Sequence, residues 1–135
     1  MAGESRLWDR LSARLKPVFF IQRIENLVGE GVPDVFLVRR ENGRMCWVEL
    51  KSKPKFPVRS TTKVFGDDGL RPSQIAWIHG RAVAGAAIYI LAECEKVEFL
   101  VEGIHAREFN GWTRPELERY SLVFGEKLPV SQWLP

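Results

Sequence analysis

Apolar and polar positions along the chain follow two periods, one helical and one strand-like. Residues 5–16 and 71–84 carry apolar side chains at helical spacing, and each segment has a proline at one end, where a helix stops or starts. The first helix would be capped by Ser5 and stopped by Pro17. The apolar stripes are Leu7, Trp8, Leu11 and Leu15 in the first helix, and Ile75, Ile78 and Ala82 in the second.

Strands are predicted where apolar residues are nearly continuous, at 18–24, 35–38, 47–50 and 86–92, with a further strand at 96–101. A strand, a hairpin, a helix and another strand in this order imply a right-handed parallel crossover. The pattern therefore predicts an α/β fold with a mixed central sheet flanked by helices, in one domain spanning residues 1–135. Short helices are expected near 104–109 and 115–120.

The dipeptide Asn42-Gly43 between two apolar runs is a strong hairpin signal. A two-residue turn there makes Phe36 face Glu49 and Asp34 face Lys51. Directly opposed residues share a sheet face, as do residues two apart on a strand. Asp34, Glu49 and Lys51 would then converge at the end of the hairpin farthest from its turn.

Two carboxylates and an ammonium in such strands are costly unless they are paired or bind a metal. Solvated surface charges in weak ion pairs are the alternative interpretation. Oxygen ligands from Asp34, Glu49 and the backbone carbonyl of Leu50 suit Mg²⁺, with Mn²⁺ as a substitute. The pattern thus indicates a divalent-metal hydrolytic site, in which the metal would activate a bound water.

These motifs, Pro33-Asp34 followed by Glu49-Leu50-Lys51, resemble the PD-(D/E)xK nuclease superfamily. The segment around Gln74 resembles the helix that follows this motif in the VRR-NUC and junction-resolvase branches, and the similarity spans roughly residues 18–92. The tail near 126–134 resembles the C-terminus of small phage endonuclease I resolvases. The resemblance implies a restriction-endonuclease-like core, a phosphodiester substrate, and orientation or activation of the attacking water by Lys51.

The resemblance also implies an upstream acid at the metal site. Glu25, at the end of the first strand, is the preferred candidate, while Glu4 on the first helix competes and Glu30 is a lesser alternative. Gln74 would approach from its helix and hold a phosphate or a metal-bound water.

Charge is unevenly distributed although the formal net charge is only +3. Seven basic residues against two acidic ones lie between Lys51 and Arg81, directly after the candidate site, and suit a polyanionic substrate. The expected DNA contacts are Lys53, Lys55, Arg59, Lys63 and Arg71. The segment 52–69 that carries most of them contains several loop-forming residues and is expected to be mobile.

The prediction is a Mg²⁺-dependent DNA endonuclease acting on branched DNA such as Holliday junctions in recombination. A homodimer would supply two cuts, with Trp112, Tyr120, Phe124 and Trp133 as candidate interface residues. A nicking or restriction-type nuclease and a non-catalytic nucleic-acid-binding domain are the alternatives. The sequence predicts no membrane span, no nucleotide cofactor and a cytoplasmic protein, in which Cys46 and Cys94 are buried thiols.

Overall fold

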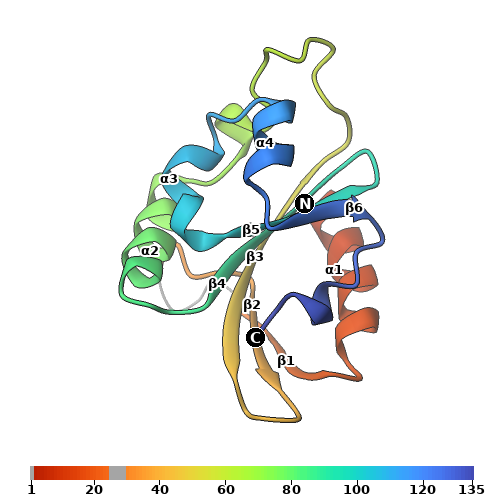
Figure 1. The fold of residues 1–135 in the computed structure, drawn as a ribbon, viewed down its shortest axis with the longest axis vertical. Coiled ribbons are helices and arrows are strands. Elements are labelled where there is room, and N and C mark those ends of the chain that lie inside the picture. Colours follow the sequence, from red (N-terminus) through yellow and green to blue (C-terminus); the bar gives the residue numbers. More distant parts are fainter. Residues whose placement is uncertain (1, 25–29) are drawn as a thin grey trace.

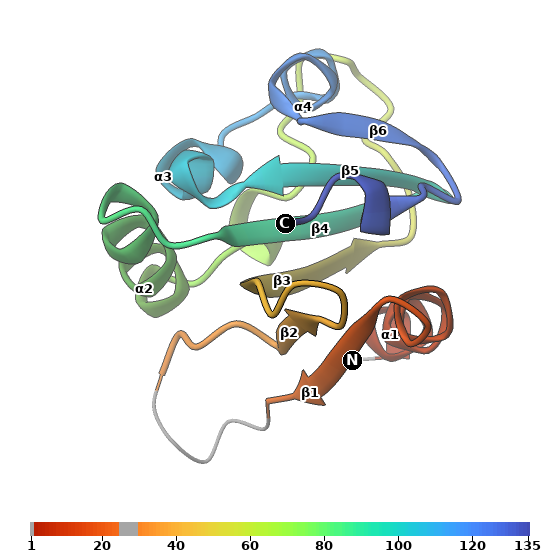
Figure 2. The same ribbon diagram turned by 60° about the horizontal axis from the view of Figure 1, so that its bottom comes forward.

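The computed structural model describes residues 2–24 and 30–135, which form a six-stranded mixed sheet between two helical layers (Figures 1 and 2). The strands lie side by side in chain order. They are β1 (Phe19–Arg23), β2 (Val35–Arg39), β3 (Met45–Lys53), β4 (Ile88–Cys94), β5 (Val97–Glu102) and β6 (Val123–Glu126). Strands β3 and β4 are parallel and the other neighbouring pairs are antiparallel, so the predicted α/β fold with a mixed sheet is confirmed.

The helices cover both faces of this sheet. Helix α1 (Ala2–Leu15) and the C-terminal segment with η3 (Val130–Gln132) lie on one face, and the remaining helices lie on the other (Figures 1 and 2). These are η1 (Gly66–Asp68), α2 (Pro72–Val83), η2 (Gly103–His105), α3 (Ala106–Phe109) and α4 (Arg114–Tyr120). Helix α1 begins at Ala2 and not after Ser5 as expected. No described helix has the length and apolar character needed to cross a bilayer.

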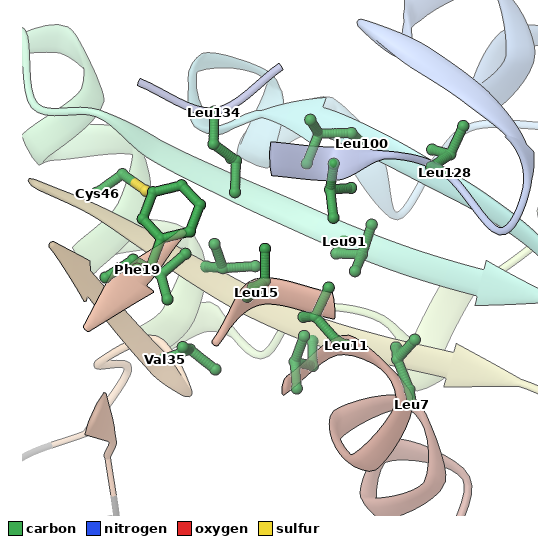
Figure 3. Packing of buried hydrophobic residues seen from close by; sticks show 14 residues of the cluster. Leu7, Leu11, Leu15, Phe19, Val35, Cys46, Leu91, Leu100, Leu128 and Leu134 are labelled. Carbon is green, nitrogen blue, oxygen red and sulfur yellow. The ribbon is translucent and has the colours of Figure 1, made fainter. Parts of the chain in front are cut away.

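Each face of the sheet has its own apolar core. Leu7, Leu11 and Leu15 of α1 are buried against β-strand residues and the C-terminal segment, as Figure 3 shows. Ile78 of α2 is fully buried in the second core, with residues from α3 and α4. The strands are therefore covered on both sides, which explains why their sequences are almost continuously apolar. Both cysteines are free and buried as predicted, and burial raises the pKa of each thiol to about 12.

The C-terminal segment after β5 was not predicted beyond its short helices, and it is held by two arginines. Arg14 of α1 pairs with buried Glu98 of β5 at 2.6 Å, and the Leu128 amide donates to the same carboxylate at 2.8 Å. Arg39 of β2 donates to three backbone carbonyls of the tail, including that of Leu134 at 2.9 Å. The guanidinium donors of Arg39 find these acceptors because the tail folds back beside the hairpin.

The hairpin register differs from the predicted one by two residues: Phe36 pairs with Trp47 and Val38 with Met45. A two-residue turn of the expected kind needs positive φ at both central residues. Of Asn42 and Gly43, only Gly43 has it, at 72°. A longer turn forms, in which the Gly43 amide donates to the Arg39 carbonyl at 2.8 Å. A shift of two preserves the side-chain parity, so the predicted sheet face survives.

The segment from Pro54 to Phe65 projects beyond the strands (Figure 1) but is tied at both ends. Near its start, the Phe56 amide donates to Glu95 at 3.0 Å and the Phe56 ring lies under Arg114. At its end, Val64 and Phe65 are buried, and the Val64 amide donates to the Trp112 carbonyl at 2.9 Å. Mobility therefore stays a prediction for the exposed part between these anchors.

Gly31 places the chain before β2 against the start of α2. It has φ of 87°, and an added Cβ would overlap the Ser73 carbonyl of α2. We expect Gly31→Ala to lower the unfolding free energy by about 3 kcal/mol, because backbone strain and overlap add. Gly43→Ala is the control: it has similar φ but open space, so only about 1 kcal/mol is expected. Chemical denaturation measures both, and equal losses would contradict the packing role of Gly31.

Candidate active site

Glu49 lies in the middle of β3, and the residue is only 1% exposed. Its Oε2 accepts a hydrogen bond from Nε2 of Gln74 at 2.9 Å and lies 3.8 Å from Nζ of Lys51. Its Oε1 is buried and has no hydrogen-bond partner within the described residues. Burial first, and then the like charge of Asp34, raise the pKa of Glu49 to about 9, although Lys51 opposes the shift.

Asp34 comes immediately before β2, where the pairing of β2 with β3 ends at Val35 and Val48. Its Oδ2 accepts the Leu50 backbone amide at 2.9 Å, so the side chain continues the hydrogen bonding that the strand no longer supplies. This bond holds the Asp34 carboxylate near Glu49, where its negative charge raises the pKa of Glu49. Asp34 therefore lies near Glu49, and the prediction that it faces Lys51 is wrong in register.

Gln74 is held by the first turn of α2, which begins at Pro72, one residue after the predicted start. Its Oε1 accepts the Arg71 amide at 2.9 Å, which leaves its Nε2 to donate to Glu49. Both ends of the amide are engaged, and the side chain is only 5% exposed. Gln74 consequently orients Glu49, and this contact brings the helix to the site as expected.

Of the two candidate upstream acids within the described residues, Glu4 and Glu30, Glu4 lies near the site. Its pKa is raised, chiefly by burial, and it is influenced by the charges of Lys51 and Asp34. Glu4 also raises the pKa of Glu49. Glu30 is exposed, and Glu25 lies outside the described residues. The site therefore brings together Glu4 of α1, Asp34 just before β2, and Glu49 and Lys51 of β3.

The oxygen donors at the site fit a divalent cation in kind, although they are few. Within residues 2–24 and 30–135, no three His, Cys, Asp or Glu side chains form a complete ligand cluster. The described part supplies the adjacent carboxylates of Asp34 and Glu49, with Glu4 as a further acid. Oxygen donors and the unpartnered Oε1 of Glu49 match a hard cation such as Mg²⁺. The Leu50 carbonyl stays a predicted ligand.

Four of the five expected DNA contacts line two clefts, and the fifth, Arg59, lies outside both. Lys63 and Arg71 line one of about 540 Å³ at the start of α2. Lys53 and Lys55 line another of about 610 Å³ beside α1, while Arg59 is exposed on the projecting loop. Lys53 also pairs with Asp68 at 3.3 Å. The second cleft contains Arg6, Arg10 and Lys96, which sequence reasoning missed because they are distant in sequence and carry no motif.

The mixed six-stranded sheet with helices on both faces has the restriction-endonuclease-like α/β fold. No family model and no curated protein matches the chain. Several solved structures are similar in fold, including the following two. A VRR_NUC domain has 17% identity and a TM-score of 0.50, covering 69% of this chain and 86% of its own. The Holliday junction resolvase Hjc of Archaeoglobus fulgidus has 16% identity and a TM-score of 0.51, covering 74% and 77%. The expected likeness to these two branches is confirmed for the fold.

Proposed function

We propose that this chain is a metal-dependent DNA endonuclease. The observation that carries the proposal is Glu49, a carboxylate 1% exposed with an unpartnered oxygen, beside the acid Asp34 and the ammonium of Lys51. A buried acid with an unpartnered oxygen destabilises the folded protein, and such groups are concentrated at functional sites. We therefore assign Glu49 a functional role. A bound cation supplies the missing partner.

Asp34 and Glu49 would hold Mg²⁺, or Mn²⁺ in its place, with Glu4 as the further acid. When bound, the metal supplies Lewis-acid chemistry at the scissile phosphate and lowers the pKa of a bound water. Lys51 orients the attacking water or stabilises charge on the phosphate, and Gln74 keeps Glu49 in position. The low exposure of Glu49, Lys51 and Gln74 strengthens their electrostatic interactions.

We propose branched DNA, such as a Holliday junction, as the preferred substrate. The likeness in fold to a protein described as a Holliday junction resolvase supports this choice. A homodimer would provide two sites for two cuts. Of the expected interface residues, Tyr120, Phe124 and Trp133 are 41–45% exposed and available, but Trp112 is 6% exposed in the core and is excluded.

Cleavage of a four-way junction and of a linear duplex, each with Mg²⁺ and with EDTA, tests this function. We expect Mg²⁺-dependent cleavage that is faster on the junction. Asp34→Asn should slow it by roughly 100-fold or more, since it removes a charged ligand but can still accept the Leu50 amide. DNA binding without cleavage would favour a non-catalytic domain, and equal rates on both substrates would favour a nicking or restriction-type nuclease.

A further inference from the structure

The cleft beside α1 begins where β3 leaves the candidate active site. Its walls include Gly3, Arg6 and Arg10 of α1, and Ser52 and Lys53 at the end of β3. Residues 3, 6 and 10 share one face of the helix, because positions three and seven apart lie on the same side. Glu4 is on a neighbouring face and is influenced by Asp34 and Lys51. Helix α1 therefore borders both the site and the cleft.

The remaining walls are the start of the projecting loop and the turn between β4 and β5. Five basic side chains line the cleft against two acidic ones, Glu93 and Glu95. Both acids are engaged: Glu93 pairs with Arg10, and Glu95 accepts the Phe56 amide at 3.0 Å. Within the described residues, Arg6, Lys55 and Lys96 have no ion-pair partner. Among the described residues that line the cleft, these three unpaired basic side chains outnumber the one carboxylate without an ion-pair partner, that of Glu95, so the cleft presents a net positive charge.

The turn that carries Lys96 has an unusual backbone. Glu95 and Lys96 have φ of 50° and 72°, a left-handed conformation that glycine or asparagine normally occupies in such turns. Each costs about 1 kcal/mol or more in this conformation. Both side chains line the cleft, where Glu95 holds the loop. The left-handed turn thus places Lys96, and Glu95 with its bond to the Phe56 amide, in the same wall of the cleft.

We propose that this cleft binds the phosphate backbone of the nucleic-acid strand as it leaves the active site. The inference rests on the proposed function. Lys53, two residues beyond Lys51 and about 7 Å along the strand, lines the cleft, and the first turn of α1 carries both Glu4 of the site and Gly3 of the cleft. The cleft therefore adjoins the site where β3 ends. Arg6 supplies a planar donor for phosphate oxygens, while Lys55 and Lys96 act as compact charges. Positive charge concentrated in a cleft attracts a polyanion more strongly than the same charge spread over a surface.

The test compares two triple variants with the same change in net charge. The cleft variant combines Arg6→Gln, Lys55→Gln and Lys96→Asn, since asparagine tolerates the positive φ of residue 96. The control variant combines Lys16→Gln, Arg44→Gln and Arg107→Gln, three exposed residues outside the cleft. Binding of a DNA four-way junction is measured against salt concentration, with Ca²⁺ replacing Mg²⁺.

We expect the slope of log affinity against log salt to fall by about 0.9 for each phosphate that the cleft variant no longer binds. The control variant should keep the wild-type slope. Equal slopes for both triples and the wild type would overturn the proposal. Each single cleft substitution is measured as well, so that a triple variant that fails to fold, as judged by circular dichroism, still leaves a decisive result.

The outcomes separate this inference from the proposed function. If wild type cleaves DNA and the cleft variant keeps its slope, the cleft assignment alone fails. If wild type binds but does not cleave, and the slope of the cleft variant falls, the endonuclease assignment alone fails. Absence of DNA binding by the wild type would overturn both.

Discussion

Replacing Lys51 with Met is expected to reduce the rate of DNA cleavage by roughly 10²–10⁴-fold, the usual contribution of a positioned proton-transfer or electrostatic group. The methionine side chain has a similar length, so the fold should survive. The ammonium also lowers the pKa of Glu49, and its loss would further favour the neutral acid and weaken Mg²⁺ binding. Initial rates on supercoiled plasmid at saturating Mg²⁺ measure the effect.

Lys53→Met is the matched control, because Lys53 is two residues farther along β3 on the same face. Its ammonium pairs with exposed Asp68 at 3.3 Å and has no contact with Glu49. We expect weaker DNA binding, with the slope of log affinity against log salt reduced by about 0.9, the value for one phosphate contact. The cleavage rate should stay within about tenfold of wild type. Comparable rate losses in both variants would show that Lys51 acts only through general charge.

Glu49→Gln should abolish metal-dependent cleavage and at the same time make the metal-free protein more stable at pH 7. A carboxylate in this position must either keep a proton or remain charged beside Asp34 in a buried site. Glutamine is neutral, and its amide can accept from Gln74 and donate towards Asp34. In EDTA, we expect the unfolding free energy of the variant to exceed that of wild type by about 2 kcal/mol, which corresponds to about 5 °C in Tm.

The sign of the pH dependence follows from the raised pKa of Glu49. Its folded pKa is about 9, against a reference value of 4.5. Between these values the folded protein holds a proton that the unfolded chain releases, so the stability of the metal-free protein should fall as pH rises. Glu49→Gln should flatten this decline. Saturating Mg²⁺ should raise the Tm of wild type but not of the variant, because a ligand stabilises only the state that binds it.

Glu98→Gln provides the contrast, because Glu98 is also a buried glutamate, at 3% exposure. Its carboxylate is fully used by Arg14 and the Leu128 amide. Removing the charge of Glu98 leaves Arg14 without its ion-pair partner. We expect the unfolding free energy to fall by about 3 kcal/mol. Thermal unfolding in EDTA should thus move in opposite directions for the two variants. A destabilised Glu49→Gln would contradict the functional origin of the unpartnered Oε1.

Local patterns in the sequence determined the elements that carry the site. Nearly continuous apolar runs predicted the strands, and helical spacing with Pro72 predicted α2, because burial on two faces or on one stripe leaves a direct periodic trace. Asp34 and Glu49 were assigned to one sheet face by parity alone. That assignment tolerated the error in register, because a shift of two residues returns every side chain to the same face.

Only the tertiary structure decided which distant side chains meet. Glu4 approaches Lys51 because the first turn of α1 lies beside β3, where Gly3 passes close to Ser52. Arg14 with Glu98, Arg39 with the tail, and Lys96 with Arg6 are likewise brought together by packing of segments far apart in the chain. Such contacts leave no periodic signal, since they depend on the relative placement of whole elements. The sequence therefore determined which strands and helix bear the acids and Gln74, whereas packing decided how those groups are oriented and where the basic cleft lies.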